Sequence, residues 1–426
     1  MKSFGTLALL GAFAGCPSPQ RPTPPAGSVT LEIGRAGGSL RGVAGDGETT
    51  YAAITIGDRT TLEARRGSSV AWQAAVAGSG GPVARTRTLL VAAIAGEGTV
   101  ADLALRGGPG VVVVALDAAS GAPRWRLAID SSEWSLITAI APAGEDVVVG
   151  GSFSGTLRAA AKVVSSAGKS DGFVARITAK GEVAWLVRTG GAWADAVQGV
   201  AVAGDRIAIA GTFATGAELL GEPLVAFDDN SPKTDVFVAE LGATGLRKWS
   251  ASFGGKLDDS VAGVAIDGKG RIAVAATARE TLHINVADIV AQGPADGLVT
   301  FFSRDGTPGP TVVLGGPDFD GLRAIVASGE HVVVGGFYAG TMLVGPQLLR
   351  ASGSDDAFLA ALDGGSLVKA WPISGSGREE ITALAPVPGG FIAGLAHTAA
   401  ASIDGQPLPA PKDPMSGAAL VVRAVR

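Results

Sequence analysis

The sequence repeats itself most clearly from the stretch Ala184-Trp185-Leu186-Val187-Arg188-Thr189-Gly190-Gly191 onward. Asp195 follows this stretch, and two alternating apolar runs come next, at 200–203 and 207–213. The copy closes with Asp235-Val236-Phe237-Val238-Ala239-Glu240-Leu241. Each run is short and is bounded by turn residues, which is the pattern of antiparallel β-strands.

The same order of features recurs along the chain with a period of roughly sixty residues. Tryptophans at 72, 125, 185, 249 and 371 mark one position of this repeat, and a further copy near Thr311 lacks the tryptophan. The copies are contiguous, so one repeated unit accounts for most of the chain.

Each unit predicts a four-stranded antiparallel sheet that is buried on both faces. In 200–203 and 207–210, large apolar residues alternate with Ala and not with polar residues. An isolated sheet would leave one of these apolar faces in water. Units arranged as a ring cover one another and leave only short, protected edges, as in a β-propeller.

The number of blades is inferred from two strand types. The Phe-Val-Ala type recurs near Leu62, Val113, Phe173, Phe237, Leu298, Phe358 and Leu420, and the Trp type near Leu31, Trp72, Trp125, Trp185, Trp249, Val312 and Trp371. We therefore expect an all-β fold, a single seven-bladed propeller of four-stranded blades over 29–426. The strands at 29–35 and 420–425 are expected to pair in the same blade, so that trimming either end opens the ring.

The first 28 residues are expected to lie outside the propeller. Residues 1–15 have a positive start and an apolar run, as export signals do. The only cysteine, Cys16, ends a stretch that resembles the lipobox of bacterial lipoproteins, which implies cleavage before Cys16 and its acylation. The alternative is an ordinary signal peptide with an unrelated cysteine. Residues 16–28 are rich in proline and predict an extended tether. By the same resemblance, Pro17 favours the outer membrane.

The composition excludes some classes of function. The chain has a formal net charge of −5 and no Lys/Arg block, so nucleic acid is not an expected partner. No cofactor or metal is expected, because the three histidines and the single cysteine have no metal-ligand spacing. A monomer is expected.

The repeat resembles a β-propeller repeat family of secreted and envelope proteins of bacteria, whose units run Asp-x-Phe-Val-Ala, turn, Trp, Gly-Gly, Asp and an alternating hairpin. The match is good over about 120–385. Separately, Ala115-Leu116-Asp117-Ala118-Ala119-Ser120-Gly121-Ala122-Pro123-Arg124-Trp125 resembles the tryptophan-docking motif of quinoprotein-like propellers. This resemblance implies that the tryptophan packs between blades. Neither resemblance implies an activity, since propellers host many unrelated functions.

Two repeated acidic positions are the candidate binding residues. One position, at the entry to the inner strand, holds Asp195, Asp259, Asp320 and Glu379, and Ser135 interrupts it; the other, before the Phe-Val-Ala strand, holds Asp171, Asp235, Asp296 and Asp356. Both are expected at the same end of the ring, where an acidic rim would attract a cation or a basic partner. The preferred interpretation is structural, because Asp commonly accepts hydrogen bonds from backbone N–H groups of its own turn.

Weaker candidates have structural explanations too. Oxygen ligands for calcium are offered by Asp228-Asp229-Asn230 near Asp235, although a solvated insertion between strands is preferred. His397 takes the place of an aromatic residue and is expected to fill that space. His283 lies in an inserted strand, and His331 lies in a turn.

The expected function is a non-catalytic envelope scaffold that binds a protein or glycan, with the lipid bilayer contacted through Cys16. The alternative is an enzyme, most plausibly quinoprotein-like, with its site at the channel mouth. A third possibility is a role like that of the propeller lipoprotein of outer-membrane barrel assembly.

Overall fold

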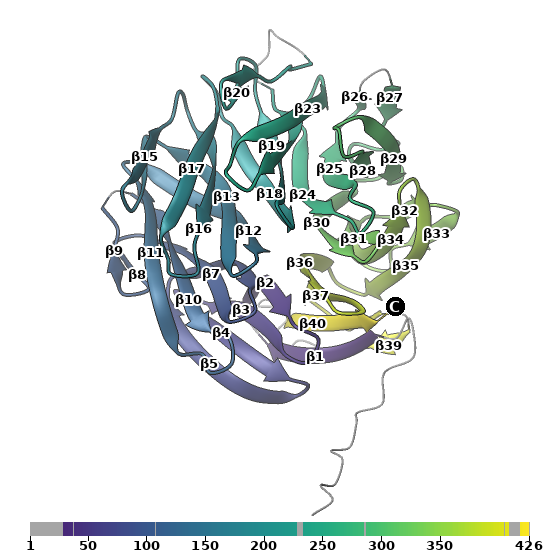
Figure 1. Ribbon diagram of the computed structural model, residues 1–426. Coiled ribbons are helices and arrows are strands. Elements are labelled where there is room, and N and C mark those ends of the chain that lie inside the picture. The colour runs from purple at the N-terminus through teal and green to yellow at the C-terminus, as the bar shows by residue number, and fades with distance from the viewer. Residues whose placement is uncertain are drawn as a thin grey trace, which may run out of the picture.

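The computed structural model describes residues 29–36, 38–106, 108–227, 233–284, 287–403, 405–408 and 418–425. For the strands at 29–36 and 418–425, only the backbone is described. The described chain is all-β, and its sheets are arranged around a central axis (Figure 1). The predicted export signal, the predicted lipid attachment at Cys16 and the predicted tether lie outside the described residues.

Six blades each consist of four antiparallel strands that follow one another along the chain from the axis outward. Blades one to three are β2 (Ser39–Gly45), β3 (Thr50–Ile56), β4 (Arg59–Arg66), β5 (Ser69–Ala77); β6 (Ser79–Arg85), β7 (Leu89–Gly96), β10 (Gly110–Asp117), β11 (Pro123–Ser131); β12 (Trp134–Ala143), β13 (Asp146–Ser154), β16 (Asp171–Ile177), β17 (Val183–Gly190). Blades four to six are β18 (Ala196–Ala203), β19 (Arg206–Phe213), β22 (Asp235–Gly242), β23 (Arg247–Gly255); β24 (Ser260–Ile266), β25 (Ile272–Ala278), β28 (Asp296–Phe302), β29 (Pro308–Leu314); β30 (Gly321–Ser328), β31 (His331–Tyr338), β34 (Asp356–Asp363), β35 (Ser366–Gly375).

The prediction of a seven-bladed propeller of four-stranded blades is wrong, because the described chain forms six such blades. Beside the six blades there is one composite sheet, of order β1-β40-β37-β36, formed by β36 (Glu379–Val387), β37 (Gly390–His397), β40 (Ala418–Val425) and β1 (Val29–Ala36). It lies between blade six and blade one and contains the predicted pairing of the two terminal strands. Counting strand types overestimated the complete blades, because the first strand and the last strand of the chain each belong to an incomplete unit.

Short outer hairpins were not predicted, and they extend several sheets beyond four strands. They are β8 (Thr99–Val100) with β9 (Leu103–Ala104), β14 (Thr156–Ala159) with β15 (Lys162–Ser165), β20 (Glu218–Leu219) with β21 (Glu222–Pro223), β26 (Thr281–Ile284) with β27 (Ala287–Val290), β32 (Thr341–Val344) with β33 (Gln347–Arg350), and β38 (Ala401–Ile403) with β39 (Gln406–Pro407). Strands β14, β20, β26 and β38 each pair with the outer strand of the preceding blade. Backbone hydrogen bonds thus join neighbouring blades at the rim.

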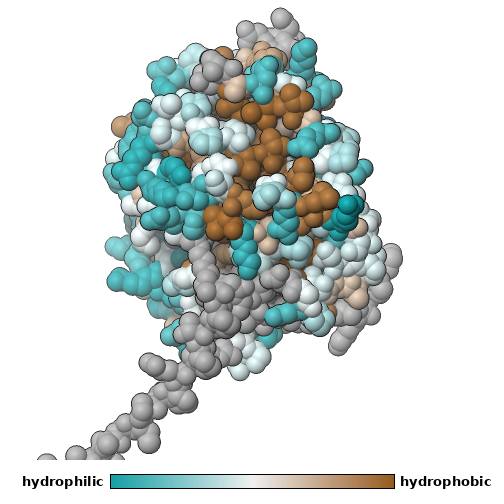
Figure 2. All heavy atoms as spheres, turned by 90° about the vertical axis from the view of Figure 1, so that its right-hand side faces the viewer, coloured by the Kyte–Doolittle hydropathy of each residue, from teal (hydrophilic) through white to brown (hydrophobic). Residues whose placement is uncertain are grey.

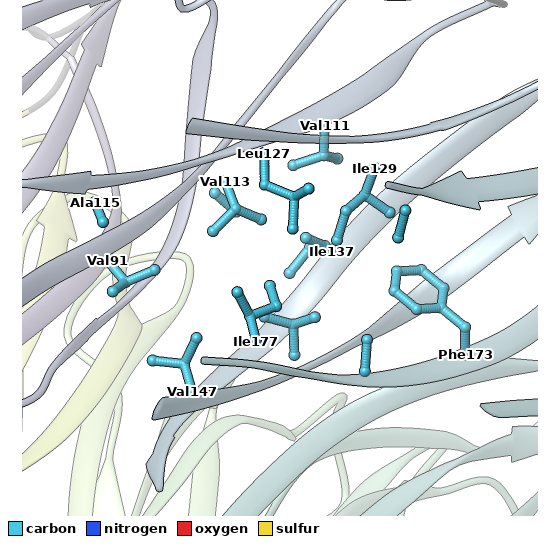
Figure 3. Packing of buried hydrophobic residues seen from close by; sticks show 14 of the residues in the cluster. Val91, Val111, Val113, Ala115, Leu127, Ile129, Ile137, Val147, Phe173 and Ile177 are labelled. Atoms are coloured by element: carbon cyan, nitrogen blue, oxygen red, sulfur yellow. The ribbon is translucent and has the colours of Figure 1, made fainter. Parts of the chain in front are cut away.

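The core lies between the blades, as the apolar alternation predicted. Figure 3 shows Val113 of blade two in one cluster with Val147 and Ile177 of blade three. All three side chains are at most 1 % exposed. Each such interface removes apolar surface of two sheets from water, which is the main favourable contribution to folding.

The outside of the ring carries scattered apolar side chains. On the side of the ring that bears β27 and β33, Figure 2 shows apolar residues gathered among polar ones. Val290, Leu343 and Leu348 on the outer hairpins are 63 %, 43 % and 48 % exposed. Within the described ranges, no helix has the length and apolar character needed to cross a bilayer.

Candidate binding site

A central channel runs between the inner strands of the six blades and of the composite sheet. Its cavity has a volume of about 190 Å³ and is lined by residues of β2, β6, β12, β18, β24, β30 and β36. Because the walls are strands of packed sheets, side chains that point into the channel are held on a rigid frame.

Every inner strand is interrupted by a register shift where it borders the channel. Such β-bulges insert an extra residue, bend the strand and re-aim a side chain. The extra residues, here called the bulge ring, are Arg41, Gly81-Pro82, Thr138, Gln198, Ala262, Arg323 and Thr382. All of them line the central channel except Gly81, which lines an adjoining cavity.

Two arginines belong to the bulge ring. Arg323 Nε lies 2.5 Å from Glu380 Oε1, so its charge is balanced, and its guanidinium lies over the Phe337 ring. Arg41 Nε donates a 3.0 Å hydrogen bond to Ser39 Oγ, and no described carboxylate forms an ion pair with Arg41. The channel wall therefore carries one positive charge without a carboxylate partner.

Two further polar atoms of the bulge ring lack partners among the described residues. Thr382 Oγ1 and Gln198 Oε1 are buried and make no hydrogen bond. By contrast, Thr138 Oγ1 donates to Val197 O at 2.6 Å. A buried polar atom without a partner costs free energy, so a hydrogen bond from a ligand group at either atom would reduce that cost.

A second cavity, of about 350 Å³, adjoins the channel between blades two and three. Arg41, Thr138 and Thr382 line both cavities. The remaining walls are small or apolar, and they include Ala93, Ala95, Val111, Leu136 and Ile137. An apolar cavity with a few convergent polar groups is the usual form of a small-molecule site.

The acidic residues predicted as a binding rim are buried instead. Asp195, Asp259, Asp320 and Glu379 are 0–3 % exposed, as are Asp171, Asp235, Asp296 and Asp356. They therefore do not form the exposed acidic rim that the sequence suggested. The two positions do lie together, because the charge of Asp171 acts on Asp195 and that of Asp235 acts on Asp259.

The first acidic position joins neighbouring blades. Asp195 Oδ2 accepts from Gly191 N at 2.7 Å in blade three, and Asp195 Oδ1 accepts from Ala214 N at 2.8 Å, after β19 of blade four. Asp259 accepts from the backbone N–H groups of Gly255 and Arg279, one on each side of the next junction. The structural interpretation of these residues therefore accounts for their contacts.

The second acidic position fixes the loop that precedes its own strand. Asp171 accepts from Ala167 N at 3.0 Å and pairs with Arg188. Asp296 and Asp356 accept from the backbone N–H groups four residues earlier, at 2.5 and 3.0 Å. Asp235 accepts from Phe227 N at 2.6 Å.

Burial perturbs the first acidic position strongly. Burial, together with the charge of a neighbouring carboxylate, raises the pKa of Asp195 to about 6 and that of Asp259 to about 8. The same causes raise the pKa of Asp320 and Glu379 to about 7. Removing a carboxylate from water disfavours its charged form, so these carboxyl groups keep their protons at pH values well above the ordinary pKa of Asp and Glu.

The weaker candidates also have positions in the structure. Asp228-Asp229-Asn230 lies outside the described residues. His397 is buried, and His283 lies in the inserted strand β26 with Nδ1 2.6 Å from Asp288 Oδ1. Within the described part of the chain, no group of His, Cys, Asp and Glu could hold a metal ion.

Sequence reasoning missed the bulge ring, although a signal for it exists. Thr138, Gln198, Ala262, Arg323 and Thr382 each lie three residues after the first acidic position or its serine substitute. The acidic candidates predicted from the sequence are positions that repeat nearly the same residue. Residues that differ between copies at one repeated position are the better sign of recognition, because a ligand needs different groups around it.

No protein-family model matches the chain, and no curated protein matches it. BamB from Moraxella catarrhalis is 14 % identical, with 93 % of this chain and 100 % of that chain covered and a TM-score of 0.44. The quinohemoprotein alcohol dehydrogenase from Comamonas testosteroni is 11 % identical, with 93 % of this chain and 76 % of that chain covered and a TM-score of 0.42. Hydrazine synthase from Kuenenia stuttgartiensis is 12 % identical, with 85 % of this chain and 94 % of that chain covered and a TM-score of 0.50.

At these identities the likeness concerns the fold alone. The assignment as a β-propeller rests on the arrangement of the sheets. Membership of the envelope repeat family stays a prediction.

Proposed function

We propose that the protein is a lipid-anchored, extracytoplasmic propeller that binds a partner at its channel without catalysing a reaction. The observation that carries this proposal is the bulge ring, which presents different side chains at equivalent positions of a rigid wall. The described residues that line the channel carry no carboxyl, imidazole or thiol group. Such a lining favours recognition over acid–base or nucleophilic chemistry.

The anchor and the location rest on the sequence. Acylation of Cys16 would tether the domain to the bilayer, and Pro17 favours the outer membrane of a Gram-negative envelope. The test is metabolic labelling of the full chain with palmitate in a Gram-negative host, compared with Cys16→Ser. Label in the native chain that is lost in the variant, together with fractionation to the outer membrane, supports the anchor; equal labelling overturns it.

Site-specific crosslinking tests binding at the channel. A photo-crosslinking residue replaces Leu136, which lines the cavity beside Arg41 and is 42 % exposed. The matched control replaces Val163, which is 49 % exposed on the outer hairpin strand β15. A defined adduct in intact envelopes from position 136 but not from position 163 supports the proposal. The same adducts from both positions, or none from position 136, count against it.

A further inference from the structure

The charge at the bulge ring selects the chemistry of a ligand. Arg323, Thr382 and Arg41 occupy three consecutive inner strands, β30, β36 and β2. Glu380 balances the charge of Arg323. Among the described residues of this three-strand arc, Arg41 is the one positive charge without a carboxylate partner, so the arc matches a ligand group with one negative charge.

The hydrogen-bond donors at the arc suit the oxygen atoms of an anionic ligand. The guanidinium of Arg41 has five N–H groups, and within the described part of the chain its Nε alone is engaged, with Ser39 Oγ. Thr382 lines the same two cavities as Arg41, and its buried hydroxyl has no partner among the described residues. A carboxylate that accepts from Arg41 and Thr382 gains charge-assisted hydrogen bonds. A phosphate dianion would leave one charge unmatched.

The adjoining cavity determines what the carboxylate is attached to. It extends from Arg41 past Ala93, Ala95 and Val111, which are small or apolar. At about 350 Å³ it has room for a short aliphatic chain. The side chains of these three residues offer no hydrogen bond, so a polar chain packed against them would lose hydration without compensation from them.

We propose that Arg41 and Thr382 bind the carboxylate of a ligand whose aliphatic chain fills the cavity between blades two and three. This inference rests on the proposed binding role of the channel and names the class of ligand. The carboxylate can come from a free carboxylic acid or from the C-terminus of a peptide with an aliphatic last residue.

Calorimetric titration of the full chain at pH 7 with acetate, butanoate and hexanoate tests the proposal. Each added methylene is expected to tighten binding about threefold to fourfold. Hexanol tests the need for charge, and inorganic phosphate tests the preference for one negative charge. N-acetyl-leucine carries the carboxylate on a peptide-like frame, so its affinity relative to hexanoate distinguishes the two sources.

Matched variants separate the two halves of the site. Arg41→Gln is expected to weaken hexanoate binding at least tenfold, whereas Arg158→Gln, on the exposed outer strand β14, leaves it unchanged. Ala95→Leu fills the cavity and is expected to abolish the gain with chain length while acetate still binds. Circular dichroism spectra that match the native chain confirm that each variant is folded.

Equal binding of hexanoate and hexanol, tighter binding of phosphate, or unchanged affinity in Arg41→Gln would overturn the proposal. These failures differ from failure of the proposed function. If crosslinking from position 136 succeeds while carboxylates do not bind, the channel binds a ligand of another class. If carboxylates bind as expected but no partner is crosslinked, the channel serves a small molecule.

Discussion

The indole Nε1 of Trp125 donates a 2.9 Å hydrogen bond to the carbonyl oxygen of Ala179 in the following blade. The same bond recurs from Trp72 to Ala118, from Trp185 to Ala243 and from Trp249 to Arg304, at 2.9–3.1 Å. In each case the acceptor lies in the turn between the third and fourth strands of the next blade. The repeated tryptophan therefore links each of these blades to the next, as the docking motif implied.

Replacing Trp125 by Phe is expected to remove this bond and keep most of the apolar contact. A neutral hydrogen bond contributes about 1 kcal/mol to stability, so the free energy of unfolding should fall by roughly that amount. Urea denaturation measures the change. Trp193→Phe is the control, because Trp193 is 36 % exposed and stands outside the docking series. A loss as large in Trp193→Phe would contradict the docking explanation.

The docking turn also requires glycine at Gly181. Its φ is +83°, and an added Cβ would lie 2.8 Å from Trp125 Cδ2. Gly144 has a similar φ of +70°, but a Cβ there meets nothing within 4 Å. Gly144→Ala therefore measures the backbone strain alone, about 1 kcal/mol. Gly181→Ala is expected to lower the unfolding temperature clearly more, and equal losses would show that the tryptophan can move aside.

Trp371 is the informative exception to the docking pattern. Its Nε1 is buried and has no partner among the described residues. Trp125 lies opposite Ala115, next to the bulge between the third and fourth strands, and the other docking tryptophans have the same register. In blade six the residue next to that bulge, Ala361, lies opposite Lys369, whereas Trp371 lies two residues further along, opposite Leu359. The expectation that Trp371 marks the same position as the other tryptophans is therefore wrong, and its indole does not reach the docking turn.

Much of the fold could be predicted because one period dominates the sequence. The alternation of Ala with large residues predicted sheets buried on both faces, and the burial of Ile207, Ala208 and Ile209 confirms it. The predicted blade count failed at β1 and β40, because the four strands of the composite sheet are not consecutive in the sequence. The outer hairpins were missed because they are strands of two to four residues, too short for a readable alternation.

The site was harder to predict, because most of its residues share a spacing from the acidic position but not a residue type. Asp195 and Asp259 repeat one acidic position, and in the structure both accept backbone hydrogen bonds from two neighbouring blades. Arg41 and Thr382 occupy equivalent bulges but differ in type, so repetition does not mark them. A bulge depends on how a strand pairs with its neighbour, which the sequence of one strand does not state.

Deleting the two terminal strands should have unequal effects. Strand β40 pairs with both β1 and β37, whereas β1 pairs only with β40. Removing residues 418–425 therefore leaves β36 and β37 without either outer strand of their sheet. Removing residues 29–36 only exposes the edge of β40. We expect the larger fall in unfolding temperature for the C-terminal deletion. Differential scanning fluorimetry compares the two deletions, and the opposite order would contradict the composite sheet.

Stability should also fall as the pH rises through the neutral range. The folded pKa of Asp259 is about 8 and those of Asp320 and Glu379 are about 7, above their ordinary values of 3.8 and 4.5. Between these limits the folded chain binds more protons than the unfolded chain, so the free energy of unfolding decreases with rising pH. One pKa unit corresponds to about 1.4 kcal/mol, so even one such carboxyl gives a measurable slope.

Asp259→Asn tests the origin of that slope. The amide keeps the shape of the side chain and cannot ionise, although it offers one acceptor oxygen where the carboxyl offers two. The variant should therefore be somewhat less stable than the native chain at pH 5 and should lose less stability between pH 5 and pH 8.5. Asp205→Asn, in the exposed turn between β18 and β19, should reproduce the native slope. Unfolding temperatures recorded across this pH range test the prediction. If the native chain became more stable as the pH rises, or if Asp259→Asn left the pH dependence of stability unchanged, the buried carboxyls would be charged in the folded propeller.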